Sequence, residues 1–81
     1  MILVEIRIPV LHETIDFRLR EDGTADDIRR SLLRSLRMMT HEDGPDEDGF
    51  VLLDADSGRI LSGGRTMKEC GIRNGSSLML L

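Results

Sequence analysis

The last quarter of the chain constrains the fold most tightly. Residues 62–81 read SGGRTMKECGIRNGSSLMLL: a glycine-marked loop, a short helical turn at residues 66–70, the apolar Ile72, an Asn74-Gly75 turn and an apolar strand at residues 77–81. An Asn-Gly pair tolerates positive φ at both central positions of a tight turn, so we expect a sharp reversal there. An apolar strand that comes this late in the chain is stable only if earlier elements flank it. The upstream sequence must therefore supply its neighbours.

The amino-terminal segment supplies two strands. Residues 2–8 alternate in a period of two, which places Ile2, Val4, Ile6 and Ile8 on the buried face. Pro9 cannot donate to a strand ladder and ends this strand. After a loop at residues 9–13, residues 14–20 alternate again, and the side chains expected to face inward are Ile15, Phe17 and Leu19. The pattern predicts an antiparallel hairpin with one face exposed to water.

At Gly23-Thr24 the apolar spacing changes from that of a strand to that of an α-helix. Thr24 is a good N-cap, and Asp27 three residues later makes a weak capping box. One apolar stripe follows, formed by Ile28, Leu32, Leu33, Leu36 and Met39. We therefore expect a helix from Ala25 to Met38 or Met39, with a single stripe to bury against a sheet.

The middle of the chain is less regular. Residues 41–49 are acidic and lack the spacing of an EF-hand, so we expect a solvated loop rather than a calcium site. A short strand is predicted at residues 50–53, a turn at 54–58 and a brief return strand at 59–61. This order of elements predicts one α+β domain over residues 1–81. Its layout is a β-grasp, in which a mixed sheet of four to five strands carries the main helix on one face.

The composition argues against several classes of protein. The net charge is −4 and the only aromatic residues are two Phe, which disfavours nucleic-acid binding by phosphate neutralisation or base stacking. The single cysteine excludes an internal disulfide, a four-thiolate zinc site and a cysteine-ligated iron–sulfur cluster. The chain shows neither a signal-peptide pattern nor a run of about 20 apolar residues. We expect a soluble cytoplasmic protein that does not insert into a membrane.

Residues that could carry chemistry are few and scattered. Cys70 has no histidine beside it in the sequence to activate it as a nucleophile, so we interpret it as a structural thiol. His12 and His41 lie in separate loops, and a zinc site would need ligands from elsewhere. Gly63-Gly64 lacks the Lys-Ser/Thr partner of a phosphate-binding loop. We predict no catalysis, no cofactor and no metal.

Residues 61–81 resemble the end of a ubiquitin fold. The resemblance lies in the segment from Gly64 to Met67, the Ile72 plug and the closing apolar strand, which look like the Gly-Arg-Thr-Leu segment, the isoleucine and the final strand of that fold. More narrowly, the chain resembles the YukD/EsaB group of small bacterial ubiquitin-like proteins of type VII secretion systems. The features shared with that group are the length, the Ser62-Gly63 loop, Cys70-Gly71-Ile72 and Asn74-Gly75.

This resemblance implies a protein-interaction module rather than an enzyme. By analogy with the group, we expect an accessory or regulatory component of a type VII secretion system, located in the cytoplasm or peripheral to the membrane complex. Its partner would be another protein, such as a membrane or ATPase component of that system.

The sequence departs from ubiquitin-like modifiers at its end. Modifiers and sulfur carriers continue past the last strand into a flexible tail ending in Gly-Gly, whereas this sequence stops at Leu81 and its Gly63-Gly64 pair is internal. We therefore expect a module that is not conjugated to other proteins. Two alternatives stay open: a modifier or sulfur carrier with a missing or processed tail, and the amino-terminal domain of a larger membrane protein.

Partner recognition would fall on exposed side chains. If Leu78 and Leu80 point inward, strand alternation turns Met79 and Leu81 outward. The side chains expected to join them are Leu52, alone or with Phe50, and nearby Leu3. A contiguous apolar patch marks an interaction site, whereas scattered exposed apolar residues carry no such meaning.

The predicted helix carries a second candidate surface. Arg30, Arg34 and Arg37 share one face of it at helical spacing. This stripe could meet an acidic partner, but a charge stripe on a helix is more commonly its solvated face. The sequence leaves both interpretations open.

Overall fold

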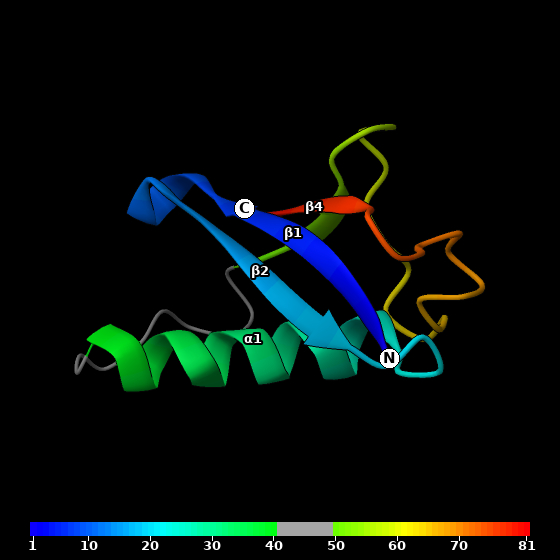
Figure 1. The fold of residues 1–81 in the computed structure, drawn as a ribbon, viewed down its shortest axis with the longest axis horizontal. Coiled ribbons are helices and arrows are strands. Elements are labelled where there is room, and N and C mark those ends of the chain that lie inside the picture. The colour runs from blue at the N-terminus through cyan, green and yellow to red at the C-terminus, as the bar shows by residue number, and fades with distance from the viewer. Residues whose placement is uncertain (41–49) are drawn as a thin grey trace.

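The computed structural model describes residues 1–40 and 50–81, with the side chains of residues 38–40 left out. The elements are β1 (Ile2–Ile8), the 3-10 turn η1 (Pro9–Leu11), β2 (Glu13–Leu19), α1 (Ala25–Thr40), β3 (Leu52–Asp54) and β4 (Ser77–Leu80). The strand order in the sheet is β2-β1-β4-β3. β1 and β4 are parallel, the other two pairs are antiparallel, and α1 covers one face of the sheet (Figure 1). This is the predicted α+β arrangement of a β-grasp, ubiquitin-like fold.

The amino-terminal hairpin forms as predicted. All four even-numbered apolar residues of β1 are buried, and Leu19 of β2 is buried with them, while Ile15 and Phe17 are half-buried against the core. β2 begins and ends one residue earlier than predicted. Pro9 starts η1 rather than continuing the strand, and His12 closes the turn in the left-handed region at φ 53°.

The apolar stripe of α1 faces the sheet. Its buried residues are Ala25, Ile28, Leu32, Leu33 and Leu36, whereas the side chain of Met39 is outside the description. The Thr24 hydroxyl accepts a hydrogen bond from the backbone N–H of Asp27 at 3.2 Å, which is the N-cap contact expected at this position. The helix runs one or two residues beyond the predicted end. The acidic loop predicted at residues 41–49, with His41, lies outside the described residues.

The second half of the sheet differs from the prediction in two ways. β3 is centred further along the chain than the predicted strand at 50–53. The return strand predicted at 59–61 is reduced to an isolated bridge between Leu53 and Ile60, so the described sheet has four strands. Val51 and Leu81 exchange backbone hydrogen bonds of 2.7 and 2.9 Å, which continue the β3–β4 ladder by one pair.

The loop before β4 is built on a single helical turn. Cys70 N–H donates to the Thr66 carbonyl at 3.0 Å, and the turn ends at Gly71, whose φ is +78°. Ile72 N–H donates to the Met67 carbonyl at 2.9 Å and Gly71 N–H to the Lys68 carbonyl at 3.1 Å, which is the Schellman pattern. The two residues that this pattern brings together, Met67 and Ile72, are both buried. The predicted helical turn and the Ile72 plug are confirmed.

The predicted Asn74-Gly75 reversal also forms. Ser76 N–H donates to the Arg73 carbonyl at 2.9 Å, and Gly75 has a φ of +89°. Of the two central residues only Gly75 has a positive φ, and the predicted tight turn is confirmed. The Asn74 side chain accepts a hydrogen bond from the backbone N–H of Leu3 at 2.9 Å. The turn thereby ties the start of β4 to β1.

Candidate functional site: the outer face of the sheet

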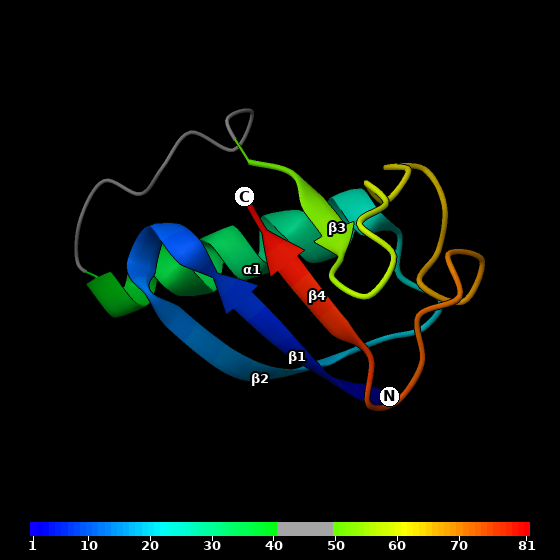
Figure 2. The same ribbon diagram turned by 90° about the horizontal axis from the view of Figure 1, so that it is seen from above.

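The sheet face opposite α1 presents a row of side chains set by strand register. Met79 of β4 pairs with Arg7 of β1 on one side and with Leu53 of β3 on the other, and Leu53 is bridged to Ile60. Paired residues point to the same face of a sheet. Since Leu78 and Leu80 are fully buried under the sheet, this row lies on the opposite, outer face. Figure 2 shows β1, β4 and β3 side by side in this order.

A second pair extends the apolar part of this row. Val51 and Leu81 lie two positions from Leu53 and Met79 along their strands, so they point outward as well. We call Val51, Leu53, Ile60, Met79 and Leu81 the outer patch. Ile60, Leu81 and Val51 are 66%, 49% and 42% exposed, and the other two are half-buried. Five apolar side chains thus meet on one exposed surface.

A charged pair borders the outer patch. Arg7 lies beside Met79, and its Nε is 3.3 Å from Oε1 of Glu5, two positions back along β1. Both side chains are about half exposed, and such a surface pair contributes at most about 1 kcal/mol to stability. Breaking the Arg7–Glu5 pair would therefore cost little stability.

The structure corrects two of the predicted patch residues. Met79 and Leu81 point outward as predicted. Leu52 does not: it is 3% exposed and packs in the core opposite Leu80, because pairing with a buried residue of β4 turns it inward. Phe50, two residues earlier, is half-buried against the core rather than on the outer face. It lines a hollow between α1 and β3 together with Ala25, Asp26, Arg29, Val51, Leu52 and Leu61.

Sequence reasoning missed three members of the outer patch. Val51 and Leu53 belong to the strand for which the opposite facing was expected, and Ile60 was assigned only to a return strand. Leu3 is exposed on the same face of the sheet, but Glu5 and its neighbour Ser77 separate it from Met79. It is therefore apart from the outer patch.

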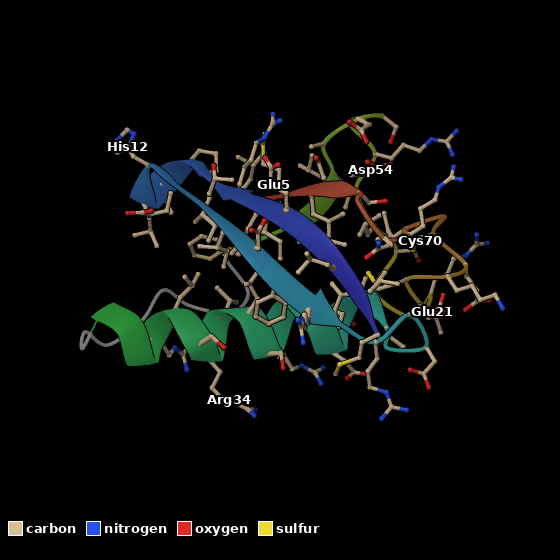
Figure 3. All side chains as sticks on the ribbon, in the orientation of Figure 1. Glu5, His12, Glu21, Arg34, Asp54 and Cys70 are labelled. Atoms are coloured by element: carbon tan, nitrogen blue, oxygen red, sulfur yellow. The ribbon has the colours of Figure 1, made fainter. Side chains whose placement is uncertain are left out.

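The arginine stripe of α1 is exposed but lies on the other side of the molecule. Arg30, Arg34 and Arg37 are all exposed, and Nη1 of Arg30 is 3.9 Å from Oδ1 of Asp27. Arg34 points away from the sheet in Figure 3. Because α1 covers the inner face, this stripe and the outer patch cannot contact the same small surface. A binding role for the stripe stays a prediction.

The residues considered for chemistry that the structure describes are not brought together. His12 and Cys70 lie at opposite ends of the molecule in Figure 3. Cys70 is half-buried against the core under the helical turn. Within residues 1–40 and 50–81 no group of three or more His, Cys, Asp or Glu is placed to hold a metal ion. Gly63 contacts the start of α1 through its carbonyl oxygen, which accepts from Asp26 N–H at 3.1 Å.

The described part of the chain contains no helix long and apolar enough to cross a membrane. No curated protein matches the sequence. The family model described as WXG100 protein secretion system (Wss), protein YukD, matches residues 3–80, nearly the whole chain and every strand of the sheet. The chain therefore belongs to the YukD family of the WXG100 protein secretion system.

Proposed function

We propose that this chain is a non-catalytic ubiquitin-like subunit that binds another protein of the WXG100 secretion system through the outer patch. The observation that carries the proposal is the contiguity of five apolar side chains on the face that α1 leaves uncovered. Contiguous exposed apolar surface on a small protein marks an interaction site, because leaving it in contact with water is unfavourable.

The surroundings of the patch define the kind of partner. Its centre fits an apolar surface, and Arg7 on the β1 side fits a carboxylate at the edge of that surface. A membrane or ATPase component of the secretion machine that presents such a surface to the cytoplasm is the partner we propose. The role would be that of an accessory or regulatory subunit at the periphery of the membrane complex.

The test is affinity capture from the native cells with solubilised membranes and three tagged variants. Leu81→Asp and Ile60→Asp each place a charge in the outer patch. Both positions are well exposed, Ile60 at 66% and Leu81 at 49%. Leu3→Asp is the matched control: it lies on the same sheet face, is 44% exposed, and is outside the patch. All three must keep the cooperative unfolding transition of the wild type. Leu52→Asp is unsuitable because it would bury a charge in the core.

We expect the wild type and Leu3→Asp to capture the same secretion-system protein under native washing, and the two patch variants to capture it at least about tenfold less well. Equal capture by all variants would exclude the outer patch as the binding surface. A captured protein that survives denaturing washes would point to covalent attachment, which is the modifier alternative.

A further inference from the structure

One edge strand of the sheet is covered and the other is not. At the β3 edge, Leu53 is bridged to Ile60, and Leu61 N–H donates to the Leu52 carbonyl at 3.0 Å. β2 is the other edge, seven residues long, and no described segment runs along its free side (Figure 2). An uncovered edge of this length is a template for pairing with another strand. We propose that two copies of this chain dimerise by antiparallel pairing of their β2 edges.

The hydrogen-bonding groups on the free side of β2 follow from the pairing of β1. Glu5 N–H donates to the Ser76 carbonyl at 3.0 Å, so the N–H and C=O groups of Glu5 point toward β4. Successive residues of a strand point to opposite sides, so Val4 turns its groups to Phe17, its partner in β2. The N–H and C=O groups of β2 that remain free therefore belong to the even-numbered residues Thr14, Asp16 and Arg18.

This parity restricts the register of a dimer. In a symmetric antiparallel pair, the free N–H and C=O groups of one β2 strand must face those of the other so that they can form hydrogen bonds. An even-numbered residue therefore lies opposite an even-numbered residue of the second copy. Pairing Asp16 with Asp16 or Arg18 with Arg18 places like charges directly opposite each other, which is destabilising. In the register intermediate between these two, Asp16 of each copy lies opposite Arg18 of the other. This register forms two opposite-charge pairs.

The charges on β2 are poorly matched within one copy. Asp16 lies opposite Glu5 of β1, a like charge, and Arg18 lies opposite the apolar Leu3. Both Asp16 and Arg18 are exposed, and neither takes part in an ion pair in the part of the chain that the structure describes. A second copy in this register places a cation beside each Asp16 and an anion beside each Arg18.

The inner face of β2 supports the same register. Phe17, which is half-buried, would lie opposite Phe17 of the second copy, and Ile15 opposite Leu19. Beside Leu19, between β2 and α1, is a hollow of about 460 Å³ that is also lined by Phe17 and Ile28. Ile15 of the second copy would lie at its rim. The dimer thus covers apolar surface that a single copy leaves at its edge.

The interface is small, so the dimer should be weak. Only residues 15–19 of each β2 strand overlap in this register. Because the overlap is short, we expect the surface area buried by the dimer to be below the ~1,200 Å² typical of stable complexes. We expect a dissociation constant on the order of 10 µM to 1 mM. This proposal does not depend on the outer patch, which lies over β3 and β4, at the opposite edge of the sheet from β2.

Sedimentation equilibrium of the whole chain tests the register by charge reversal. Asp16→Arg and Arg18→Asp change the net charge in opposite directions, yet each should weaken dimerisation at least about tenfold by creating two like-charge pairs. The double variant Asp16→Arg/Arg18→Asp restores opposite charges and should return the dissociation constant to within about threefold of the wild type. Asp56→Arg, on an exposed turn residue away from β2, is the matched control and should have no effect.

Amide hydrogen exchange at low and high protein concentration gives an independent readout. The free N–H groups of Asp16 and Arg18 should exchange more slowly at high concentration, whereas Phe17, whose N–H points to β1, should be protected at both. A chain that stays monomeric up to about 1 mM overturns the proposal. So does a dimer that neither single reversal weakens, or one whose weakening is not restored by the double variant.

Discussion

Gly63 lies directly against Asp26 at the start of α1: its carbonyl oxygen accepts the Asp26 N–H at 3.1 Å, and a Cβ on Gly63 would lie 2.6 Å from both Asp26 carboxylate oxygens. Arg65 contributes a parallel contact, since its carbonyl accepts the Ala25 N–H at 2.9 Å. These two carbonyls satisfy amide groups that the first turn of a helix leaves without intrahelical partners. The loop before β4 is thereby fixed to the helix.

Replacing Gly63 with Ala should lower the free energy of unfolding by about 1–2 kcal/mol, because the Asp26 side chain must leave its position beside Arg29, 3.5 Å away. Gly64→Ala is the matched control, as a Cβ there meets no atom within 4 Å, and it should change stability by no more than about 0.5 kcal/mol. Urea denaturation measures both. Equal effects of the two substitutions would show that the Asp26 contact does not matter.

Met67 should be among the most sensitive core positions although it belongs to a loop. It is 0% exposed, and its N–H donates to the Gly23 carbonyl at 2.9 Å, which places it under the turn before α1. Met67→Ala should cost about 2–5 kcal/mol in unfolding free energy, by loss of burial and creation of a cavity. Met79→Ala, at a half-buried position of the outer patch, should cost clearly less. Chemical denaturation of both variants measures the two losses. A larger loss for Met79→Ala than for Met67→Ala would show that the loop packs loosely.

Glu69 should make a pH-dependent contribution to stability. Its Oε1 accepts the Thr66 N–H at 3.0 Å while its own N–H donates to the Thr66 hydroxyl at 3.1 Å, a reciprocal capping box. The backbone hydrogen bond from Thr66, followed by that of its side chain, lowers the pKa of Glu69. A lowered pKa in the folded state stabilises the fold above the unfolded-state pKa, and this contribution is lost as the pH falls through the folded-state pKa.

The measurement compares the wild type with Glu69→Gln across a pH series of urea denaturation curves. The variant keeps an acceptor oxygen but cannot ionise. We expect the wild type to be the more stable at neutral pH and the difference to shrink as the solution becomes acidic. A difference that is the same at every pH would mean that the carboxylate charge plays no part.

Asn74 should be required for the order of the first residues of β1. Its Oδ1 accepts the Leu3 N–H at 2.9 Å, and the Gly75 N–H donates to the Leu3 carbonyl at 2.8 Å. Asn74→Ala should lower the unfolding free energy by about 1 kcal/mol and speed exchange of the Leu3 amide hydrogen, whereas Asn74→Asp keeps an acceptor and should retain the protection. Unchanged Leu3 exchange in the Ala variant would contradict this role.

The elements predicted well are those whose sequence pattern has one interpretation. The alternation from Ile2 to Ile8 leaves a single choice of buried face, and the spacing from Ile28 to Leu36 leaves a single helical stripe. Both predictions are confirmed because burying the opposite face would place charged side chains such as Glu5 in the core.

The candidate site was harder to predict because its strand carries no such pattern. Residues 50–53 are all apolar, so either face could be buried, and the choice falls to the pairing of Leu52 with Leu80. A related limit applies to Asn74: the Asn-Gly pair indicates a turn, but the contact of its side chain with Leu3 joins residues far apart in the sequence and could not be predicted from the local pattern. Ile60 joins the outer patch through a single bridge to Leu53, which its local sequence does not indicate.

The two central strands of the sheet, β1 and β4, come from opposite ends of the sequence and lie parallel. During synthesis, the hairpin and α1 leave the ribosome with the apolar inner face of the sheet still incomplete. That surface is closed only when residues 77–80 arrive and insert between β1 and β3. Such long-range pairing slows folding, because a long stretch of chain must be ordered before the contact is gained. The nascent protein therefore passes through a stage in which its future core is accessible to chaperones.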